Sequence, residues 1–577
     1  MINNQVSNGK SPELKDNMIY SVDRRVKTLS ISIGIGVILI LVTLALAAAT
    51  LGVVVNRLKD KTNSPSLGSQ YAESIKISDV MMHLNELQNI ASNANGTRAI
   101  NTIGFNRTLD YINNYLSSHT NFKVATTYFY LRNFVLSSIP TLMTSINGVT
   151  VNRIFSTNLS ASEFFFAQYT KSANFADYVP ISVIPNLGCS DADWLAVNPS
   201  PNGRVALVKR GNCSFINKAV LASKYNVAAL LLYNDGTSPN SMAPIYVSLG
   251  QNNELPALFL SYTLGQELAD AAQDPSNNVG VRITISVTDE SLYPVGNICA
   301  DTPTGDATQT IVIGGHSDSV PAGPGINDNG SGSAANLGLA VALARLFQTS
   351  YEKYKYRVRF CWWGAEEVGL LGSDFHVKQA KLSTVAGERL SDYLINLNYD
   401  MLGSPNYIFG IYDGRTANNN TPTQALPGSN KITSLFREWF TEQNLPWNNT
   451  DFSGRSDYGP FLAEGIVAGG LFSGADGLKS MEERNYYDKM LGQGMGGIAG
   501  AIHDPCYHRA CDSIQNINVF AFEKMVQAAA YVLEYLARQD DLKGWLYPPA
   551  QIQRLNTQQK QRPEYNSINE YFGLPYF

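Results

Sequence analysis

Residues 311–333, IVIGGHSDSVPAGPGINDNGSGS, are the stretch that most constrains how this chain can fold. The apolar, β-branched run that leads to His316 predicts a buried strand. A loop rich in proline and glycine follows, and Asp328 stands just before the apolar run AANLGLAVALARLF, which predicts a helix over 334–347. The stretch therefore places a histidine at a strand end and an aspartate near a helix start, and both side chains are good zinc ligands.

Predicted strands and helices alternate from residue 296 onward. The strand-like runs QTIVIGG, RVRFCWW and YLINLNYD are separated by predicted helices over 334–347 and 370–379. This alternation predicts an α/β fold with a mixed, mainly parallel sheet sandwiched between helices. In such sheets, ligands bind at the carboxyl ends of the strands.

Further metal-binding side chains fall at comparable places in the chain. Glu366 and Glu367 follow RVRFCWWGA, Asp400 ends YLINLNYD, and His508 lies in the loop HDPCYHRACD. We group these residues into two predicted metal sites, His316 with Asp328 and Asp400, and Asp328 with Glu367 and His508. Asp328 would bridge two ions, and ions about 3.5–4 Å apart can activate a shared water.

Three other residues have predicted catalytic roles. Glu366, which is left without a metal, is placed to act as the general base. Asp318 can accept the ring N–H of His316 that does not face the metal. Tyr507 can donate a hydrogen bond to a developing oxyanion.

Taken singly, each of these residues has an ordinary interpretation. Asp328 could cap a helix, Glu366 and Glu367 could be solvated loop acids, and His508 could be a surface histidine. We expect structural roles for His83, His376 and His503. The ordered set, and no single member of it, carries the metal-site hypothesis.

The motifs HSDSVPAGPGINDNGSG, WWGAEEVGLLGS, NLNYDMLGSPN, GRSDYGPF and DPCYHRACD resemble, in this order, those of metallopeptidase family 28. The resemblance is to its co-catalytic di-zinc aminopeptidases, in particular the secreted and vacuolar branch. It implies a zinc exopeptidase-like fold, two Zn²⁺ per chain and peptide substrates with a free N-terminus. It implies that Asp328 bridges the two ions, that Glu366 is the general base, and that Glu367 and Asp400 bind metal directly. Arg455 is a weaker candidate for positioning the substrate.

The stretches GRVALVKRGNCSFINKAVLAS and LLLYNDG resemble a protease-associated domain inserted into the peptidase domain. Two alternatives to an aminopeptidase stay open. One is a carboxypeptidase or amidohydrolase of the same clan, and the other is a non-catalytic, receptor-like homologue.

The chain has 577 residues, too many for one ordinary core, so we expect several domains. The predicted divisions are a cytosolic tail (1–27), a transmembrane signal anchor (28–55), a stalk (56–75), an N-terminal part of the peptidase domain (76–175), a small β-rich protease-associated domain (176–290), the catalytic domain (291–545) and a C-terminal extension (546–577). A net charge of -5 and a pI near 5.8 provide no basic surface for nucleic acid. The sequence indicates no oligomeric state.

Residues 28–55 carry no charge and exceed the ~20 residues that span a bilayer. More basic residues precede this segment than follow it closely, which favours a cytosolic N-terminus. The catalytic body is then expected outside the cell or in a vacuolar or lysosomal lumen, and it would be secreted if the anchor were cleaved. Possible N-glycosylation sites agree with this location: Asn95, Asn106, Asn158, Asn212, Asn419 and Asn448.

The six cysteines show no CxxC spacing, which argues against a thiolate metal site or redox pair. In an oxidising compartment we expect Cys506 to pair with Cys511 and Cys189 to pair with Cys213. Cys299 and Cys361 lie in strand-like runs, and we expect them to be buried free thiols.

Overall fold

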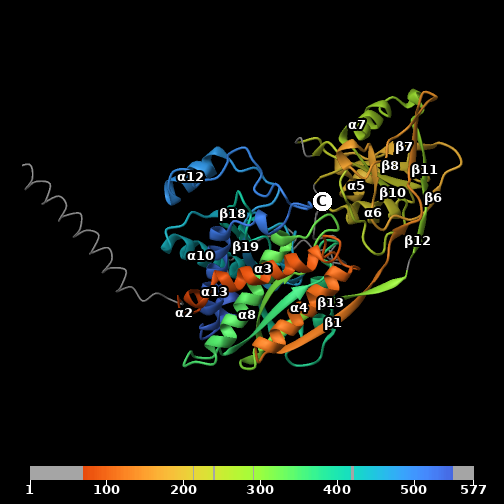
Figure 1. Cartoon of the computed structure of the whole chain (residues 1–577). Coiled ribbons are helices and arrows are strands. Elements are labelled where there is room, and N and C mark those ends of the chain that lie inside the picture. Colours follow the sequence, from red (N-terminus) through yellow and green to blue (C-terminus); the bar gives the residue numbers. More distant parts are fainter. Residues whose placement is uncertain (1–68, 212, 238–240, 290, 418–420, 550–577) are drawn as a thin grey trace, which may run out of the picture. The chain divides into compact units, whose positions relative to one another are not determined.

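The computed structural model describes residues 69–549, except 212, 238–240, 290 and 418–420 (Figure 1). The predicted cytosolic tail, the membrane segment 28–55 and nearly all of the C-terminal extension lie outside the described residues. Within the described ranges, no helix is both long enough and apolar enough to cross a membrane.

A mixed sheet of eight strands forms the centre of the peptidase part. Its order is β1 (Lys123–Arg132), β13 (Leu292–Asp301), β15 (Tyr356–Trp363), β14 (Asp306–His316), β16 (Tyr393–Tyr399), β19 (Val467–Phe472), β17 (Gly410–Tyr412) and β18 (Asn448–Thr450). The four central strands β15, β14, β16 and β19 are parallel, whereas β1 and β13 are antiparallel to their neighbours. The predicted mixed α/β fold is confirmed.

Helices pack on both faces of this sheet. The helices of the peptidase part are α2 (Ser69–Ser74), α3 (Ile77–Ser92), α4 (Ile103–His119), α8 (Gly332–Leu346), α9 (Leu371–Leu382), α10 (Leu426–Glu442), α11 (Tyr458–Ala463), α12 (Met481–Leu491), α13 (Val519–Ala537) and α14 (Leu542–Leu546). Side chains alternate between the faces along each strand. Ile311 and Ile313 of β14 join the core under α3, α4, α8 and α13, while Val312 between them joins a smaller core with residues of α9 and α11.

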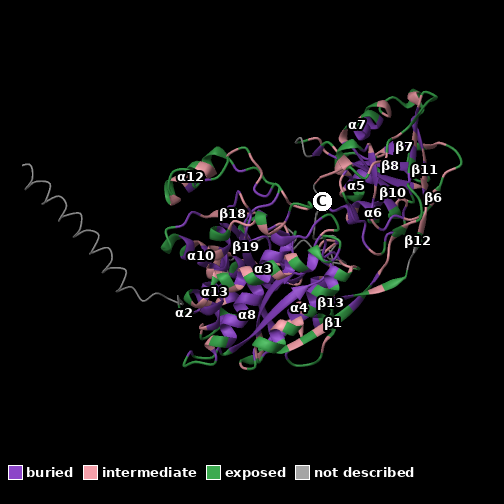
Figure 2. Cartoon of the chain, in the orientation of Figure 1, coloured by how far each residue is buried: buried purple, intermediate pink, exposed green. Residues whose placement is uncertain are grey.

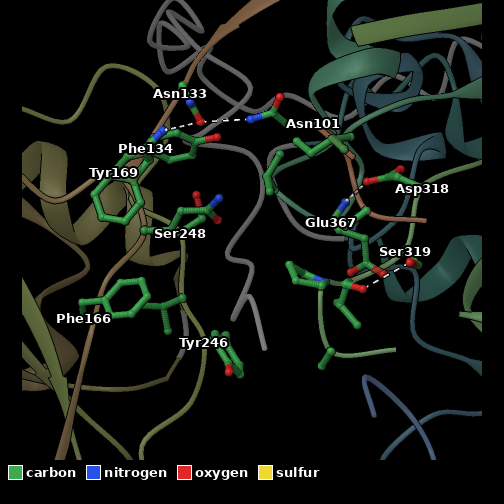
Figure 3. A pocket seen from close by; sticks show the side chains of 18 of the residues that line it. Asn101, Asn133, Phe134, Phe166, Tyr169, Tyr246, Ser248, Asp318, Ser319 and Glu367 are labelled. Atoms are coloured by element: carbon green, nitrogen blue, oxygen red, sulfur yellow. Dashed lines mark hydrogen bonds between the residues drawn. The ribbon is translucent and has the colours of Figure 1, made fainter. Parts of the chain in front are cut away.

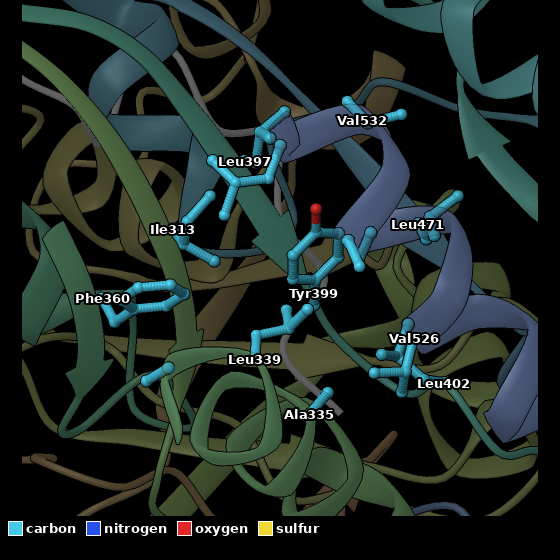
Figure 4. Close-up of a cluster of buried hydrophobic side chains, with 14 of the residues drawn as sticks. Ile313, Ala335, Leu339, Phe360, Leu397, Tyr399, Leu402, Leu471, Val526 and Val532 are labelled. Atoms are coloured by element: carbon cyan, nitrogen blue, oxygen red, sulfur yellow. The ribbon is translucent and has the colours of Figure 1, made fainter. Parts of the chain in front are cut away.

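The larger core is continuous. Figure 4 shows Leu339 of α8 and Val526 of α13 packed around Tyr399 and Leu397 of β16. Figure 2 shows that the central strands β15 and β16 are buried, whereas the outer helix faces are exposed. This core fixes the carboxyl ends of the parallel strands, where the predicted ligands lie.

A second sheet belongs to the inserted unit. Its strands are, in order, β4 (Val149–Asn152), β3 (Thr141–Ile146), β11 (Gly280–Ile285), β7 (Val179–Val183), β8 (Val205–Lys209), β9 (Ala229–Tyr233), β10 (Ala257–Leu260) and β5 (Phe164–Phe166), with β6 (Ala173–Asn174) paired to β11. Helices α5 (Asp191–Leu195), α6 (Phe215–Lys224) and α7 (Tyr262–Ala271) accompany it. The sheet therefore recruits residues from Thr141 onward, ahead of the predicted boundary at 176.

The chain leaves the peptidase part after β1 and returns to it at β13, two strands that pair along their whole length. Between the two parts, the outgoing β2 (Val135–Leu136) pairs with the returning β12 (Val287–Asp289). The inserted unit thus stands at the end of a long hairpin, joined by two paired segments.

The cysteines form three disulfides. Cys189–Cys213 and Cys506–Cys511 are the predicted pairs. The expectation of free thiols at Cys299 and Cys361 is wrong, because these two residues also form a disulfide. They lie directly opposite each other on the antiparallel strands β13 and β15, a register that the sequence alone does not reveal.

Leu339→Ala should lower the free energy of unfolding of the peptidase part by about 2–5 kcal/mol, because Leu339 is 0% exposed and its removal leaves a cavity. Urea unfolding followed by circular dichroism would measure this loss. The matched control is Leu382→Ala, at a leucine that is 78% exposed, where we expect a change below about 0.5 kcal/mol. Equal effects of the two substitutions would contradict the described core.

Candidate metal centre

Three neighbouring parallel strands bring acidic and imidazole groups to one edge of the sheet. β14 ends at His316, Glu366 and Glu367 follow β15, and Asp400 follows β16. The turns after β15 and β16 are sharp, because Ala365 and Met401 adopt left-handed conformations with φ of 60° and 54°. Such conformations are uncommon for residues with a side chain and gather at functional sites.

Asp328 reaches the same edge from a short irregular helical turn, Ile326–Ser331, that leads into α8. Asp512 holds this turn, because its carboxylate accepts hydrogen bonds from the backbone N–H groups of Asn327 (2.8 Å) and Asp328 (3.0 Å). At Gly332, where α8 begins, a Cβ atom would lie 2.1 Å from the carbonyl oxygen of Tyr399. Glycine at this position therefore lets the turn approach β16.

The predicted ligands form two groups that share Asp328. His316 Nε2 lies 3.3 Å from Asp328 Oδ1 and 3.4 Å from Asp400 Oδ1. His508 Nε2 lies 3.0 Å from Asp328 Oδ2 and 3.1 Å from Glu367 Oε2. Within each group, all ligand atoms lie within 4.8 Å of one another, and each Asp328 oxygen faces a different histidine.

The donors fit a divalent cation of borderline hardness. Imidazole nitrogens and carboxylate oxygens in sets of three are suitable zinc ligands. Glu367 Oε1 and Asp400 Oδ1 are buried without a hydrogen-bond partner. Buried carboxylate oxygens are costly unless a cation or donor compensates them, so this set favours bound positive charge.

Crowding of the acids shifts their protonation. Burial, together with Asp328, raises the pKa of Glu367 to about 7. Burial, together with Asp457 and Asp400, raises the pKa of Glu366 well above its usual range, against the opposing charge of His316. These shifts report the repulsion that a bound cation would relieve.

Asp318 lies behind the site and is fully buried. Its carboxylate accepts hydrogen bonds from the backbone N–H groups of Glu366 (3.2 Å) and Glu367 (3.4 Å). His316 Nδ1 lies 3.2 Å from the Asp318 carbonyl oxygen and 3.6 Å from its carboxylate Oδ1. Asp318 therefore orients both the ring of His316 and the turn that bears the two glutamates.

A cavity of about 290 Å³, which we call the inner cavity, opens onto Asp328, Glu366 and Asp400. Tyr507 and Arg455 line it as well. The Tyr507 ring stacks on His508 with centroids 3.9 Å apart, and burial raises the pKa of its phenol well above the usual range, so the hydroxyl stays protonated. The other described lining residues include apolar side chains and two acids, Ile408, Tyr412, Phe472, Asp451 and Asp476.

No other histidine of the described residues belongs to either ligand group. His83 bonds Tyr111 and His376 bonds Tyr393. His503 lines the inner cavity, yet it is in neither ligand group.

Sequence reasoning missed three charged residues around the site. Asp457 is fully buried, and burial together with Asp400 and Asp318 raises its pKa to about 7. Asp512 holds the Asp328 turn as described above. Asp457 lies in the motif GRSDYGPF and Asp512 lies in DPCYHRACD, so the family motifs could have indicated both residues.

The third residue, Arg98, lies in none of the family motifs, because it belongs to the N-terminal part of the peptidase domain, far from the ligands in sequence. It is fully buried and donates to three carbonyl oxygens of one loop, those of Ser317, Pro324 and Gly325. Burial lowers the pKa of Arg98 to about 10, with nearby Asp318 and Asp512 opposing this shift, so the side chain stays cationic at neutral pH. Arg98 thus ties the loop between His316 and Asp328 to the helices before it.

Arg98→Met should destabilise the protein by about 3–5 kcal/mol, because it leaves three buried carbonyls unpaired and removes a buried cation from beside the carboxylates. Thermal unfolding would measure the loss, and zinc release to a chelator should become faster. The control is Arg107→Met at an exposed arginine of α4, whose one described hydrogen bond is to the Asn93 carbonyl. Unchanged stability and zinc retention in Arg98→Met would contradict this role.

Two protein-family models match parts of this chain. Residues 297–533 match peptidase family M28, and residues 175–268 match the PA domain. A probable leucine aminopeptidase 2 of Aspergillus fumigatus is 38% identical over 375 residues, covering 65% of this chain and 69% of that protein. An aminopeptidase of Pseudomonas aeruginosa is 33% identical over 473 residues, covering 80% of this chain and 81% of that protein.

Solved structures share the fold. An aminopeptidase from Aneurinibacillus sp. strain AM-1 aligns with a TM-score of 0.59 at 21% identity, over 82% of this chain and 96% of that one. A zinc aminopeptidase from Bacillus subtilis aligns with a TM-score of 0.51 at 18% identity, over 80% and 94%. Together with the sequence relatives, these matches show that the chain belongs to peptidase family M28, as a metallo-aminopeptidase with an inserted PA domain.

Proposed function

We propose that this protein is a zinc-dependent aminopeptidase that removes N-terminal residues from peptides, with two zinc ions per chain and Glu366 as the general base. The observation that carries the proposal is the shared carboxylate of Asp328, which faces His316 with one oxygen and His508 with the other. Asp328 is buried, so this arrangement is not a cluster of solvated surface acids. The names of the sequence relatives support the aminopeptidase class.

One ion would be held by His316, Asp328 and Asp400. The other would be held by Asp328, Glu367 and His508. Zinc bound there supplies Lewis-acid chemistry, polarising a carbonyl and lowering the pKa of water. Ser456 donates to Asp400 Oδ2 at 2.6 Å and so orients this carboxylate.

Glu366 is suited to proton transfer. It belongs to neither ligand group, and its Oε2 lies 3.9 Å from His316 Nε2. A carboxylate beside both ligand groups is in position to take a proton from water and return it to a leaving amine. Tyr507 is placed on the inner cavity to donate to the developing oxyanion.

The inner cavity suits the N-terminal residue of a substrate. Its acidic groups attract an α-ammonium group, and Ile408, Tyr412 and Phe472 offer an apolar surface to the side chain. A carboxypeptidase would instead need basic groups for a terminal carboxylate. Arg455 is the one arginine or lysine among the described residues of this cavity, and Asp451 and Asp476 line it too.

Glu366→Gln should lower kcat by about 10²–10⁴-fold and leave zinc content unchanged, because the amide cannot accept the proton of water. Hydrolysis of leucine p-nitroanilide and zinc analysis by mass spectrometry would measure both quantities. Glu482→Gln, at an exposed glutamate of α12, serves as the control. Cleavage of N-blocked dipeptides in preference to the anilide would favour the carboxypeptidase alternative, and full activity of Glu366→Gln would refute the base.

Asp328→Asn should remove both zinc ions, whereas Asp400→Asn should remove only one, since Asp400 belongs to a single group. Zinc per chain, measured after loading and desalting, distinguishes the two variants. Equal zinc content in both variants would contradict the bridging role of Asp328. A wild-type protein that binds no zinc at all would favour the receptor-like alternative.

The catalytic body is proposed to work outside the cytosol, at the cell surface or in a vacuolar or lysosomal lumen. Three disulfides support this location, because such bonds persist in oxidising compartments.

A further inference from the structure

A second and larger cavity, of about 600 Å³, lies between the inserted PA domain and the peptidase part. We call it the junction cavity. On the peptidase side it reaches Glu367 and His508, two residues of the metal groups. On the other side its surface is aromatic, and Figure 3 shows Phe166, Tyr169 and Tyr246 across the cavity from Glu367 and Asp318.

The aromatic side of the junction cavity is a packed surface. Phe134 lies 5.9 Å from both Phe166 and Tyr169, measured between ring centroids. Tyr169 is 1% exposed and forms the base of the cluster. Tyr246 is 47% exposed, although it packs against Phe165 at 5.1 Å, so much of its surface is accessible to a ligand.

The inner and junction cavities meet at Glu367 and His508, which line both. Glu366 and Asp400 line only the inner cavity. A peptide whose α-ammonium group sits among the inner acids therefore points its carboxyl side toward the junction cavity. The junction cavity therefore lies where the peptide on the carboxyl side of the scissile bond would bind.

The charged residues that line the junction cavity limit which substrate side chains can bind there. No lysine or arginine is among its described lining residues, whereas Asp318 and Glu367 are. A carboxylate on the residue after the scissile bond would find no lysine or arginine among these lining residues to pair with. The cavity is better matched to apolar side chains on a longer peptide than to dipeptides or acidic residues.

We propose that the junction cavity binds the leaving peptide, and that the PA domain selects substrates with an aromatic or large apolar residue directly after the scissile bond. This inference rests on the proposed aminopeptidase function and adds to it a substrate class. Phe166 and Tyr246 would contact that second residue, and the buried Tyr169 would support them from behind Phe134. The PA domain would thereby help to set specificity at the metal centre.

The test compares the tripeptides Leu-Phe-Ala, Leu-Ala-Ala and Leu-Glu-Ala with leucinamide, using the full chain. The wild type should hydrolyse Leu-Phe-Ala with a kcat/KM about tenfold above that for Leu-Ala-Ala, and Leu-Glu-Ala should be the poorest, because burying a ring is favourable and burying an unpaired carboxylate is not. Tyr246→Ala and Phe166→Ala should each reduce the Phe-to-Ala ratio at least about threefold. Tyr246→Phe should keep it.

Tyr178→Ala is the matched control, since Tyr178 lies in the inserted unit near Arg282 and does not line the cavity. It should retain the wild-type ratio. A wild-type ratio near one, or an unchanged ratio in both alanine variants, would overturn the inference while leucinamide hydrolysis upheld the aminopeptidase function. Absence of leucinamide and tripeptide hydrolysis would overturn the proposed function and this inference with it.

Discussion

The carboxylate of Asp328, set between two histidines, is the interaction on which the rest of the site depends. It brings together groups that are far apart in sequence, since His316 stands before it and His508 stands near the end of the domain. Glu366, Glu367, Asp400 and Asp457 lie around it, and so much buried negative charge is unstable without compensation. Burial and repulsion between these acids raise the pKa values of Glu366, Glu367 and Asp457. Bound cations would relieve this repulsion, so the same crowding that costs stability in the free protein favours zinc.

Two hydrogen-bonded supports keep Asp328 where both histidines can reach it. On one side, Asp512 accepts from the backbone at Asn327 and Asp328, and Asn516 in turn donates to Asp512. On the other side, Arg98 binds three carbonyls of the preceding loop and connects it to the N-terminal helices. Groups held in this way cannot relax apart to relieve their repulsion. The N-terminal part of the peptidase domain therefore contributes directly to the rigidity of a site whose ligands it does not supply.

The strand ends could be predicted from the sequence because local patterns determine them. An apolar run followed by a turn and a carboxylate indicates a strand edge whatever the rest of the chain does, so the places of His316, Glu366, Glu367 and Asp400 followed from the α/β pattern. Register and long-range partners carry no such local mark. The Cys299–Cys361 disulfide requires knowing that β13 and β15 are antiparallel neighbours with these residues opposite. The role of Arg98 could not be predicted either, because its hydrogen-bond partners lie more than two hundred residues away in sequence.

The position of the PA domain follows from the edge of the catalytic sheet. β1 and β13 pair over their whole length, and Arg132 at the end of one strand lies opposite Leu292 at the start of the other. An insertion between these two positions spans fixed, adjacent ends, so it closes at little entropic cost and leaves the sheet intact. The same geometry sets where the insertion stands. Tyr293 at the start of β13 lines the junction cavity beside Phe134 and Val135 of the outgoing segment, so the connection itself forms part of that cavity. A domain inserted at this hairpin end therefore lies beside the edge of the sheet that carries the candidate metal ligands, and its aromatic residues line the junction cavity there.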